Sequence, residues 1–168
     1  TGDGAKYAGE DYRHPNETIT SAVVADGVVD LSTGEDDEVG FEKGVFQFCT
    51  KLETVRLPES LRKIGDRAFY KCKTLVHVDI PSGVNEIGGW AFHTCSSLET
   101  VTIPEGVVDL PYCIFRKCKS LKSVKLPSSL KTIGEYAFRY CYALTTINDD
   151  ALEGVTEIGA SAFENCTS

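Results

Sequence analysis

The sequence predicts an α/β solenoid, a fold in which short, similar turns of chain stack along one axis. Six cysteines recur 23 residues apart, except for a last step of 25: Cys49, Cys72, Cys95, Cys118, Cys141 and Cys166. A phenylalanine precedes each of them by three residues, and a leucine follows the first five by three. A fixed period of 20–29 residues with leucines in phase is the signature of a leucine-rich-repeat solenoid.

Each turn is expected to contain one short strand. The segment Leu75–Pro81 reads Leu-x-x-Val-x-Ile-Pro, and three other turns repeat it with Leu or Ile before the proline. Val78 and Ile80 alternate with polar residues, which predicts a strand with one buried face. One such strand per turn gives a parallel stack with a spacing of about 4.8 Å. The proline ends each strand because it has no N–H for a longer ladder.

The rest of each turn predicts a sharp bend and then a short helix. Gly65, Gly88 and Gly134 stand at the bend, where we expect a positive φ that Pro111 cannot adopt in its own turn. Ala, Phe, Cys and Leu follow at i, i+1, i+4 and i+7, a spacing that fits one face of about two helical turns. We therefore expect a short α or 3₁₀ segment on the side opposite the strands.

The N-terminal part departs from the regular repeat. Residues 1–18 are interpreted as an arm or cap, and 19–168 as the solenoid. The degenerate first repeat covers 19–48 and holds ten inserted residues, which predict a solvated acidic loop at 32–42.

Regular turns follow over 49–166. In the last of them, Ile147–Val155 lacks the proline and gains two residues. The chain stops at Ser168, one residue before the next repeat leucine is due, and we expect it to be truncated at this end.

Charge is distributed unevenly along a chain whose net charge is −8. Residues 1–38 hold ten acids and two bases, whereas 39–168 hold fifteen of each and are neutral. One sector is basic: Arg116, Lys117, Lys119, Lys122, Lys125, Lys131 and Arg139. The acidic first segment argues against general nucleic-acid binding, and no apolar run is long enough to predict a membrane span.

The repeat unit resembles the BspA-like class of leucine-rich repeats. Leu75–Cys95 shows it in full as Leu-x-x-Val-x-Ile-Pro-x-x-Val-x-x-Ile-Gly-x-x-Ala-Phe-x-x-Cys. The resemblance covers about residues 45–166, with a weaker extension back to residue 19, and departs at Pro111 and Cys113-Ile114. It implies a right-handed solenoid with a concave, strand-lined face, and proteins of this kind typically serve adhesion and recognition at cell surfaces. The class shares no catalytic residues, so the resemblance implies none here.

Neither the cysteines nor the histidines form a recognisable reactive or metal-binding pattern. Neighbours in the cysteine column have parallel side chains one strand spacing apart, so we expect buried, reduced thiols and no disulfides. Structural zinc requires paired C-x₂₋₄-C ligands, which are missing, so we predict no metal, no cofactor and no enzyme activity. Cys113 lies outside the column and is expected to be more reactive. Asn16 and Asn165 stand in N-glycosylation sequons.

Two surfaces are candidates for binding a partner. Strand alternation places two columns of side chains outward on the concave face: Thr54, Arg56, His77, Asp79, Thr100, Thr102, Ser123, Lys125, Thr146 and Asn148. The alternative is an aromatic surface near the expected helical segments: Trp90, Tyr112, Tyr136, Tyr140 and Tyr142. Strand propensity alone explains the threonines equally well, and the aromatic residues can also serve as a cover for the core.

These observations lead to a functional hypothesis with two alternatives. We expect a non-enzymatic recognition or adhesion module that binds a protein, or alternatively a glycan, at the cell surface or outside the cell; the alternative location is the cytoplasm. The second hypothesis is a structural scaffold or spacer in a larger assembly. The third is a targeting segment attached to an enzyme.

Overall fold

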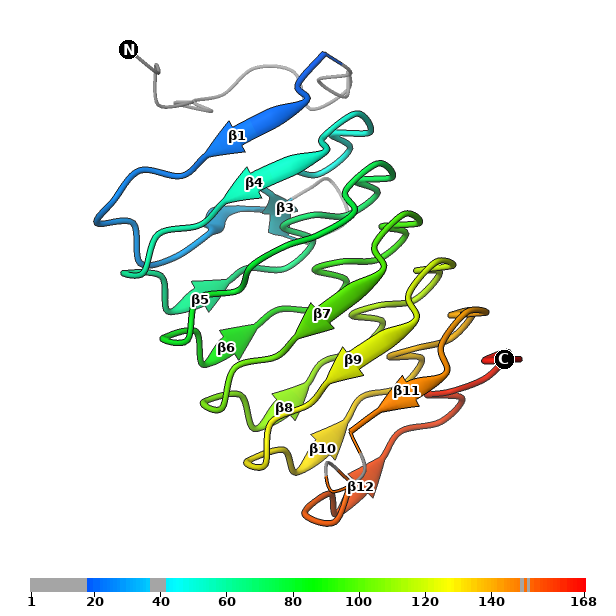
Figure 1. Cartoon of the computed structure of the whole chain (residues 1–168). Helices are drawn as coiled ribbons and strands as arrows, with labels where there is room; N and C mark the ends of the chain where they lie inside the picture. Colours follow the sequence, from blue (N-terminus) through cyan, green and yellow to red (C-terminus); the bar gives the residue numbers. More distant parts are fainter. Residues whose placement is uncertain (1–17, 37–41, 149, 151) are drawn as a thin grey trace.

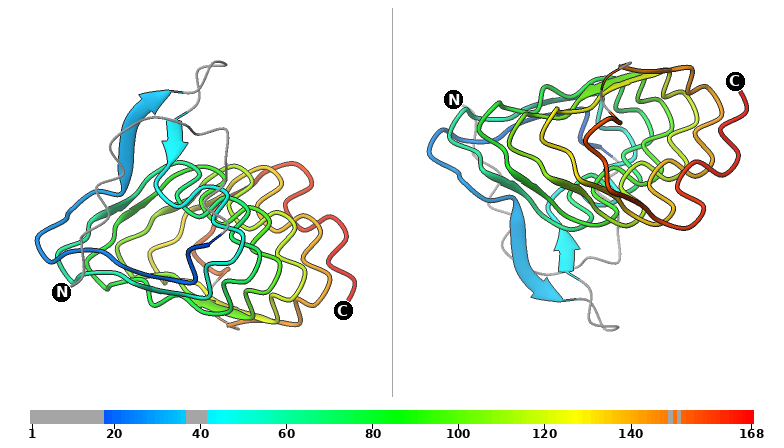
Figure 2. Two further views of the ribbon diagram at one scale, coloured as in Figure 1. Left: turned by 90° about the horizontal axis from the view of Figure 1, so that it is seen from above. Right: turned by 90° about the horizontal axis from the view of Figure 1, so that it is seen from below.

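The computed structural model describes residues 18–36, 42–148, 150 and 152–168. Its turns stack into a solenoid with β1 in the first turn and β12 in the last (Figure 1). Figure 2 looks at the stack from above and below, and shows successive turns superposed. Each regular turn has three sides: a strand face, a second column of shorter strands, and an irregular side that ends at the column cysteine, called here the turn side.

The strand face is formed by one short strand from most turns. These are β1 (Ser21–Val23), β4 (Thr54–Arg56), β7 (Thr100–Thr102), β9 (Ser123–Lys125) and β11 (Thr146–Ile147). β1 pairs with β4, and β9 pairs with both β7 and β11, all in parallel. Ala22 lies beside Val55 and Val101 beside Val124, so the degenerate first repeat stacks in the same register as the regular ones. The predicted stack of parallel strands is confirmed, with one interruption at residues 77–79.

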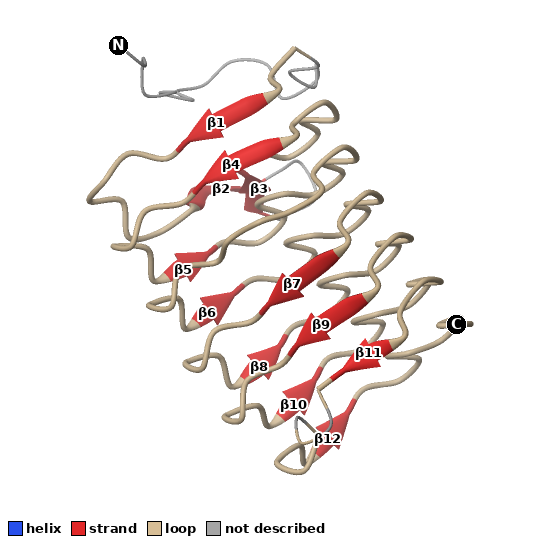
Figure 3. Cartoon of the chain, in the orientation of Figure 1, coloured by secondary structure: helices blue, strands red, loops and turns tan. Residues whose placement is uncertain are grey.

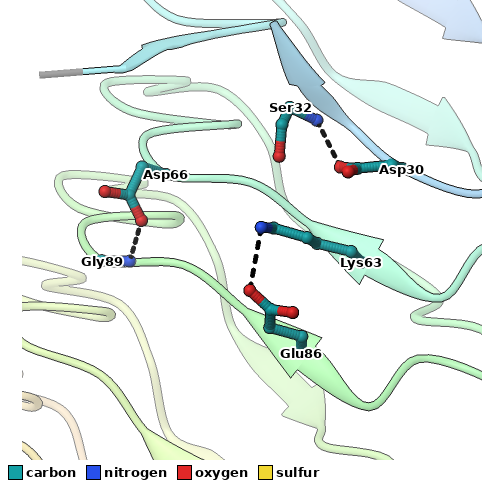
Figure 4. Close-up of polar contacts among 6 residues, drawn as sticks. All are labelled: Asp30, Ser32, Lys63, Asp66, Glu86 and Gly89. Carbon is teal, nitrogen blue, oxygen red and sulfur yellow. Dashed lines mark hydrogen bonds and ion pairs between the residues drawn. The ribbon is translucent and has the colours of Figure 1, made fainter. Parts of the chain in front are cut away.

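A second column of two-residue strands runs beside the first and was not predicted. It consists of β5 (Lys63–Ile64), β6 (Glu86–Ile87), β8 (Asp109–Leu110), β10 (Thr132–Ile133) and β12 (Glu157–Ile158). β5 pairs with β6, and β10 with β8 and β12, again in parallel. The aliphatic second residue of each strand is buried except in the last turn, where Ile158 is 53% exposed. Lys63 and Glu86 form an ion pair of 2.9 Å across β5 and β6 (Figure 4).

The segment around the ten inserted residues contains β2 (Ser32–Asp36) and β3 (Glu42–Gly44). The two strands are antiparallel, and Ser32 lies opposite Gly44. In Figure 2 they stand away from the stacked turns. The segment expected as an acidic loop thus begins and ends as paired strands, while residues 37–41 lie outside the described part of the chain.

The expected α or 3₁₀ segments are wrong: the described residues contain no helix (Figure 3). Two residues per turn, five and one before the column cysteine, have positive φ, such as Arg67 at 53° and Lys71 at 62°. A left-handed residue breaks an α-helix, and here alternate N–H groups bond to the following turn instead, while those between them bond three residues back. Phe69 N donates to Ala91 O at 2.8 Å, and Lys71 N to His93 O at 2.8 Å. The turn side is therefore a ladder between turns, not a row of helices.

The core lies between the three sides and repeats with the turn. Six phenylalanines stack from Phe46 to Phe163 with ring centroids 5.2–5.5 Å apart. The column thiol of each turn donates to the carbonyl of a phenylalanine in the preceding turn, as Cys95 Sγ does to Phe69 O at 3.1 Å. Cysteine suits this position because its small thiol fills apolar space and still satisfies a carbonyl.

The glycine at the bend has a different role from the one predicted. Among the described residues, the glycines with positive φ are Gly27 and Gly34, and neither lies at that bend. Glycine is needed there because the turns approach closely: a Cβ on Gly88 would lie 2.3 Å from Asp66 Oδ1, and one on Gly134 would lie 2.7 Å from Pro111 C. Pro111 takes this place in the turn that follows Gly88 and Gly89, which have no side chains to obstruct its ring.

Candidate functional site

The structure places the predicted strand-face residues side by side. Thr100, Ser123 and Thr146 lie in register in one column, and Thr102 lies beside Lys125 in the other. Eight of the ten predicted side chains are exposed, and Ser123 and Asn148 are half-buried. The valines between them, such as Val101 and Val124, point into the core. These columns form a continuous polar surface over successive turns.

Asn148 differs from the rest of the predicted set because its amide is engaged. Its Oδ1 accepts from Leu126 N at 2.8 Å, and its Nδ2 donates to Leu126 O at 3.2 Å. The side chain thereby takes the place of a strand neighbour for β9 at the turn that lacks the proline. We interpret Asn148 as a structural residue rather than a contact residue.

The strand face is hollowed where its pairing is interrupted. Residues 77–79 pair with neither β4 nor β7, although Val78 is buried like its counterparts in other turns. A depression of about 570 Å³ lies here. Its lining comes from three successive turns: Glu53, Thr54, Val55, Thr74, Val76, His77, Asp79 and Ser97. A hollow of this size lies within the range of ligand-binding clefts.

The floor and rim of the hollow differ in polarity. Val76 is 47% exposed, whereas the same position in other turns holds Glu53, Glu99, Lys122 or Thr145. On the rim, His77 Nε2 lies 2.7 Å from Asp79 Oδ1. Thr74 Oγ1 donates to Thr50 O at 3.1 Å and so fixes the wall. An apolar patch framed by a few oriented polar groups is the usual composition of a recognition site.

The alternative aromatic residues all lie on the turn side, in two groups. Trp90 and Tyr112 are 4.7 Å apart between ring centroids, and Tyr112 and Tyr136 are 5.6 Å apart. Tyr140 and Tyr142 form a second pair at 6.0 Å. Tyr112 and Tyr142 are the most exposed of the five. The rings of the first group contact one another edge to face between turns and shield the backbone ladder from solvent. This packing accounts for part of their role.

The sequence analysis identified Arg116 and Arg139 as part of a basic sector but did not predict that they lie against these rings. Four segments around the column cysteines, 70–73, 93–96, 116–119 and 139–142, are named here the cysteine corner. The segments hold six cations and no acid. The residue types beside each cysteine show these charges, but the contact of a cation with a ring of a neighbouring turn is not visible in the sequence.

All seven cysteines are free, six of them buried and Cys166 half-buried. Burial raises the pKa of each of them, to about 11 for Cys49. Cys113 is fully buried and its pKa is raised mainly by burial, so the expectation of a more reactive thiol there is wrong. Among the described residues, no three His, Cys, Asp or Glu side chains are grouped to hold a metal ion.

The two predicted sequons have different outcomes. Asn165 is exposed near the end of the last turn, and its side chain donates to Glu164 Oε1 at 3.2 Å. Asn16 lies outside the described residues. Glycosylation at either site stays a prediction.

Stacked parallel strands, in-phase leucines and a repeated 23-residue turn define a leucine-rich-repeat protein. Residues 40–168 match the BspA type leucine rich repeat region in six copies, and the chain belongs to this family. Leucine-rich repeats commonly mediate protein interactions, and the family is generally non-enzymatic. The comparison with curated proteins gave no match.

Two crystal structures of bacterial proteins are similar to this chain. The leucine-rich repeat protein of T. pallidum superposes with a TM-score of 0.78 at 27% identity, over 90% of this chain and 65% of that one. A leucine-rich repeat protein from Eubacterium ventriosum gives a TM-score of 0.61 at 26% identity, over 90% of this chain and 44% of that one. This chain therefore spans less than two thirds of the length of either protein. Within the described ranges, no helix is long and apolar enough to span a membrane.

Proposed function

We propose that this chain is a non-enzymatic recognition module that binds a protein partner on its strand face, with the hollow at Val76 as the centre of contact. The observation that carries the proposal is the hollow itself, which lies where two columns of exposed polar side chains pass over the interrupted sheet. The common role of leucine-rich repeats in protein interactions supports it.

Adhesion at the cell surface is part of the proposal. The BspA type of the repeats supports that location. The strand face supplies what such contact requires: side chains that vary from turn to turn on a backbone that does not. Arg56, Asp79 and Lys125 are exposed along it and give a charge pattern that can select one partner and one register.

A scaffold or spacer role is the second candidate, and one observation favours it. The phenylalanine stack and the thiol ladder join the turns without a break from Phe46 to Phe163, which makes the chain a stiff rod. A spacer would need that stiffness and would need no particular surface side chain.

The test compares two valines of similar exposure on different sides of the solenoid. Val76 lies in the hollow and is 47% exposed, and Val108 lies beside the second strand column and is 44% exposed. Immobilised wild type, Val76→Lys and Val108→Lys are incubated with extract of the native source, and retained proteins are quantified by mass spectrometry. We expect Val108→Lys to retain the wild-type partners and Val76→Lys to lose them.

Other results would redirect the assignment. If Val76→Lys and the triple change Arg56→Glu, Asp79→Lys and Lys125→Glu both keep every partner, the strand face is not the binding surface. If the pair Tyr136→Ala and Tyr140→Ala then loses them, the aromatic surface is the site. If all variants keep all partners, the scaffold role is favoured. Circular dichroism of each variant checks that the fold is unchanged.

A further inference from the structure

The cysteine corner is a concentrated positive surface on an acidic protein. Its four segments contain Lys71, Lys73, Arg116, Lys117, Lys119 and Arg139, and no acidic residue. The chain as a whole has a net charge of −8. Because successive segments are joined by the turn-side ladder, as where Lys117 N donates to Arg139 O at 2.8 Å, the segments lie along one line down the solenoid, and three of the four hold the cations while 93–96 holds none. Like charges so arranged repel each other, so a bound anion would stabilise them.

Aromatic rings hold several of these cations in place. Lys71 Nζ lies 4.8 Å from the ring centroid of Phe48 and 5.1 Å from that of Tyr70. Arg139 Cζ lies 4.8 Å from the ring of Tyr140 and 5.0 Å from that of Tyr136. A cation that is stacked on a ring loses less conformational freedom when a partner binds it. The corner is therefore pre-organised, unlike a set of free surface lysines.

Arg116 differs from Arg139, the other arginine of the corner, because no carboxylate of the described residues pairs with it. Its Nη1 lies 3.4 Å from His93 Nε2, a long contact to a side chain that is only 5% exposed. Its Nε is buried and has no hydrogen-bond partner. In the next turn, by contrast, Arg139 Nη2 donates to Glu164 Oε1 at 2.9 Å. A half-buried guanidinium with open donors is costly unless a ligand satisfies it.

His93 does not compete for that ligand. Burial, followed by the positive charges of Arg116, Lys117 and Lys71, lowers the pKa of His93 to about 4. The ring is therefore neutral at physiological pH, contacts Thr94 Oγ1 through Nδ1 at 2.8 Å and stacks on Tyr70 at 5.0 Å. It supports Arg116 and adds no charge to the corner.

We propose that the cysteine corner is a second docking surface, for a segment of a partner protein rich in aspartate and glutamate, with Arg116 as the anchor of a carboxylate. The planar guanidinium fork matches a carboxylate with two parallel hydrogen bonds. Tyrosine and arginine together are the residues that concentrate binding energy in protein interfaces. The corner lies on the turn side and does not depend on the strand-face proposal.

The test measures fluorescence anisotropy of a labelled peptide of six glutamates separated by glycine and serine, with the glutamine version as reference. We expect the glutamate peptide to bind at low salt and to weaken as salt rises, because exposed charges are screened. The glutamine version should not bind. The double variant Arg116→Gln with Lys117→Gln should weaken binding about tenfold or more, the effect expected from losing hydrogen bonds to a charged group.

A matched control separates the contribution of the corner to peptide binding from that of the protein's net charge. Lys125→Gln with Lys131→Gln removes the same charge from other sides of the solenoid, and we expect less than about a twofold loss because those lysines lie outside the corner. Arg116→Lys keeps the charge without the fork and should bind with intermediate affinity. Lys117→Gln with Lys119→Gln serves if the Arg116 variant does not fold.

Three results would overturn the proposal. Equal losses in the corner variant and the control variant would show attraction by net charge alone. Absence of binding by the glutamate peptide at low salt would remove the carboxylate site. Displacement of a bound glutamate peptide by a sulfated oligosaccharide or an oligonucleotide at lower concentration would show that the corner serves a polyanion of another class.

Discussion

The turn side and the strand face of the same turns differ in how far their residues and contacts repeat from turn to turn. On the turn side every regular turn repeats the same phenylalanine, the same thiol-to-carbonyl bond and two left-handed residues. On the strand face the outward residues change from turn to turn, and the pairing stops at residues 77–79. The comparison indicates that the repeated contacts lie on one side, which leaves the side chains of the other free to vary, as the proposed recognition role requires.

The largest effect is expected from the phenylalanine stack. Phe92 is fully buried between Phe69 and Phe115, so Phe92→Ala should lower the free energy of unfolding by about 3–5 kcal/mol. Phe163 is half-buried and stacks on Phe138, and Phe163→Ala should cost less because an end turn frays without the middle. Urea denaturation measures both. Equal losses would contradict a stack whose stability comes from neighbouring turns.

The second effect is a dependence on pH that arises at His93. Its pKa is about 4 in the folded protein against an ordinary value of 6.5, so between these values the unfolded chain binds a proton that the folded chain does not. The free energy of unfolding should therefore fall as pH falls through this window, by about 2 kcal/mol between pH 7 and pH 4.5 from this group. Well above pH 6.5, where the histidine is neutral in both states, the group contributes no slope.

A matched pair of variants isolates this histidine. His93→Gln should flatten the pH profile, whereas Thr100→Gln, at an exposed site on the strand face, should leave it as in the wild type because neither side chain ionises in this range. The profile is measured by urea denaturation at several pH values. The same slope in His93→Gln and the wild type would show that other groups cause the acid sensitivity.

A smaller effect tests the backbone of the turn side. Lys117 has a φ of 65°, a conformation that glycine adopts freely and alanine does not. Both Lys117→Gly and Lys117→Ala remove the same charge, so their difference reports the backbone alone. We expect the glycine variant to be more stable than the alanine variant by about 1 kcal/mol in thermal unfolding. Greater stability of the alanine variant would mean that the left-handed geometry is not maintained in solution.

The smallest effect belongs to the strand face. Arg56, Asp79 and Lys125 point into solvent, so reversing their charges should change stability by less than about 0.5 kcal/mol each. Thermal unfolding of the triple variant checks this. A loss comparable to that of Phe92→Ala would show that the strand face carries part of the fold, and the division between the two sides would no longer hold.

The repeat could be predicted because the residues that produce it lie close together in the sequence. Phe92, Cys95 and Leu98 are spaced by the turn, and each fills the same space in every turn, so period and burial coincide. The parallel strand stack followed from Val101 and its counterparts, which alternate with polar residues. Family and architecture were therefore predictable from a single sequence.

The backbone conformation of the turn side could not be predicted from the sequence. Arg67, Lys71 and Trp90 have positive φ, yet these residue types rarely adopt it, so nothing in the sequence announces the conformation. The apolar spacing that fits a helix fits this ladder equally well. The glycines seemed to supply the positive φ, but they serve close packing between turns, a contact across 23 residues that local reasoning does not show.

The candidate site was predictable only in part. Alternation placed Thr54, His77 and Asp79 outward correctly, but the hollow between them depends on a break in pairing. His77-Val78-Asp79 has the same alternation as the paired Thr100-Val101-Thr102, so the local sequence does not indicate the break in strand pairing. The cations of the corner were visible as charges, whereas their stacking on rings of adjacent turns required coordinates.

The thiol column has a consequence for where the protein can work. A thiol with a pKa of about 11, as at Cys49, is ionised in about one molecule in ten thousand at pH 7. Thiol–disulfide exchange starts from the thiolate, so such a column is almost inert toward oxidants and glutathione alike. Seven free cysteines in oxidising surroundings would ordinarily form scrambled cross-links, but here folding buries six of them and half-buries Cys166. A folded chain of this kind is expected to keep the same covalent structure in reducing and in oxidising surroundings.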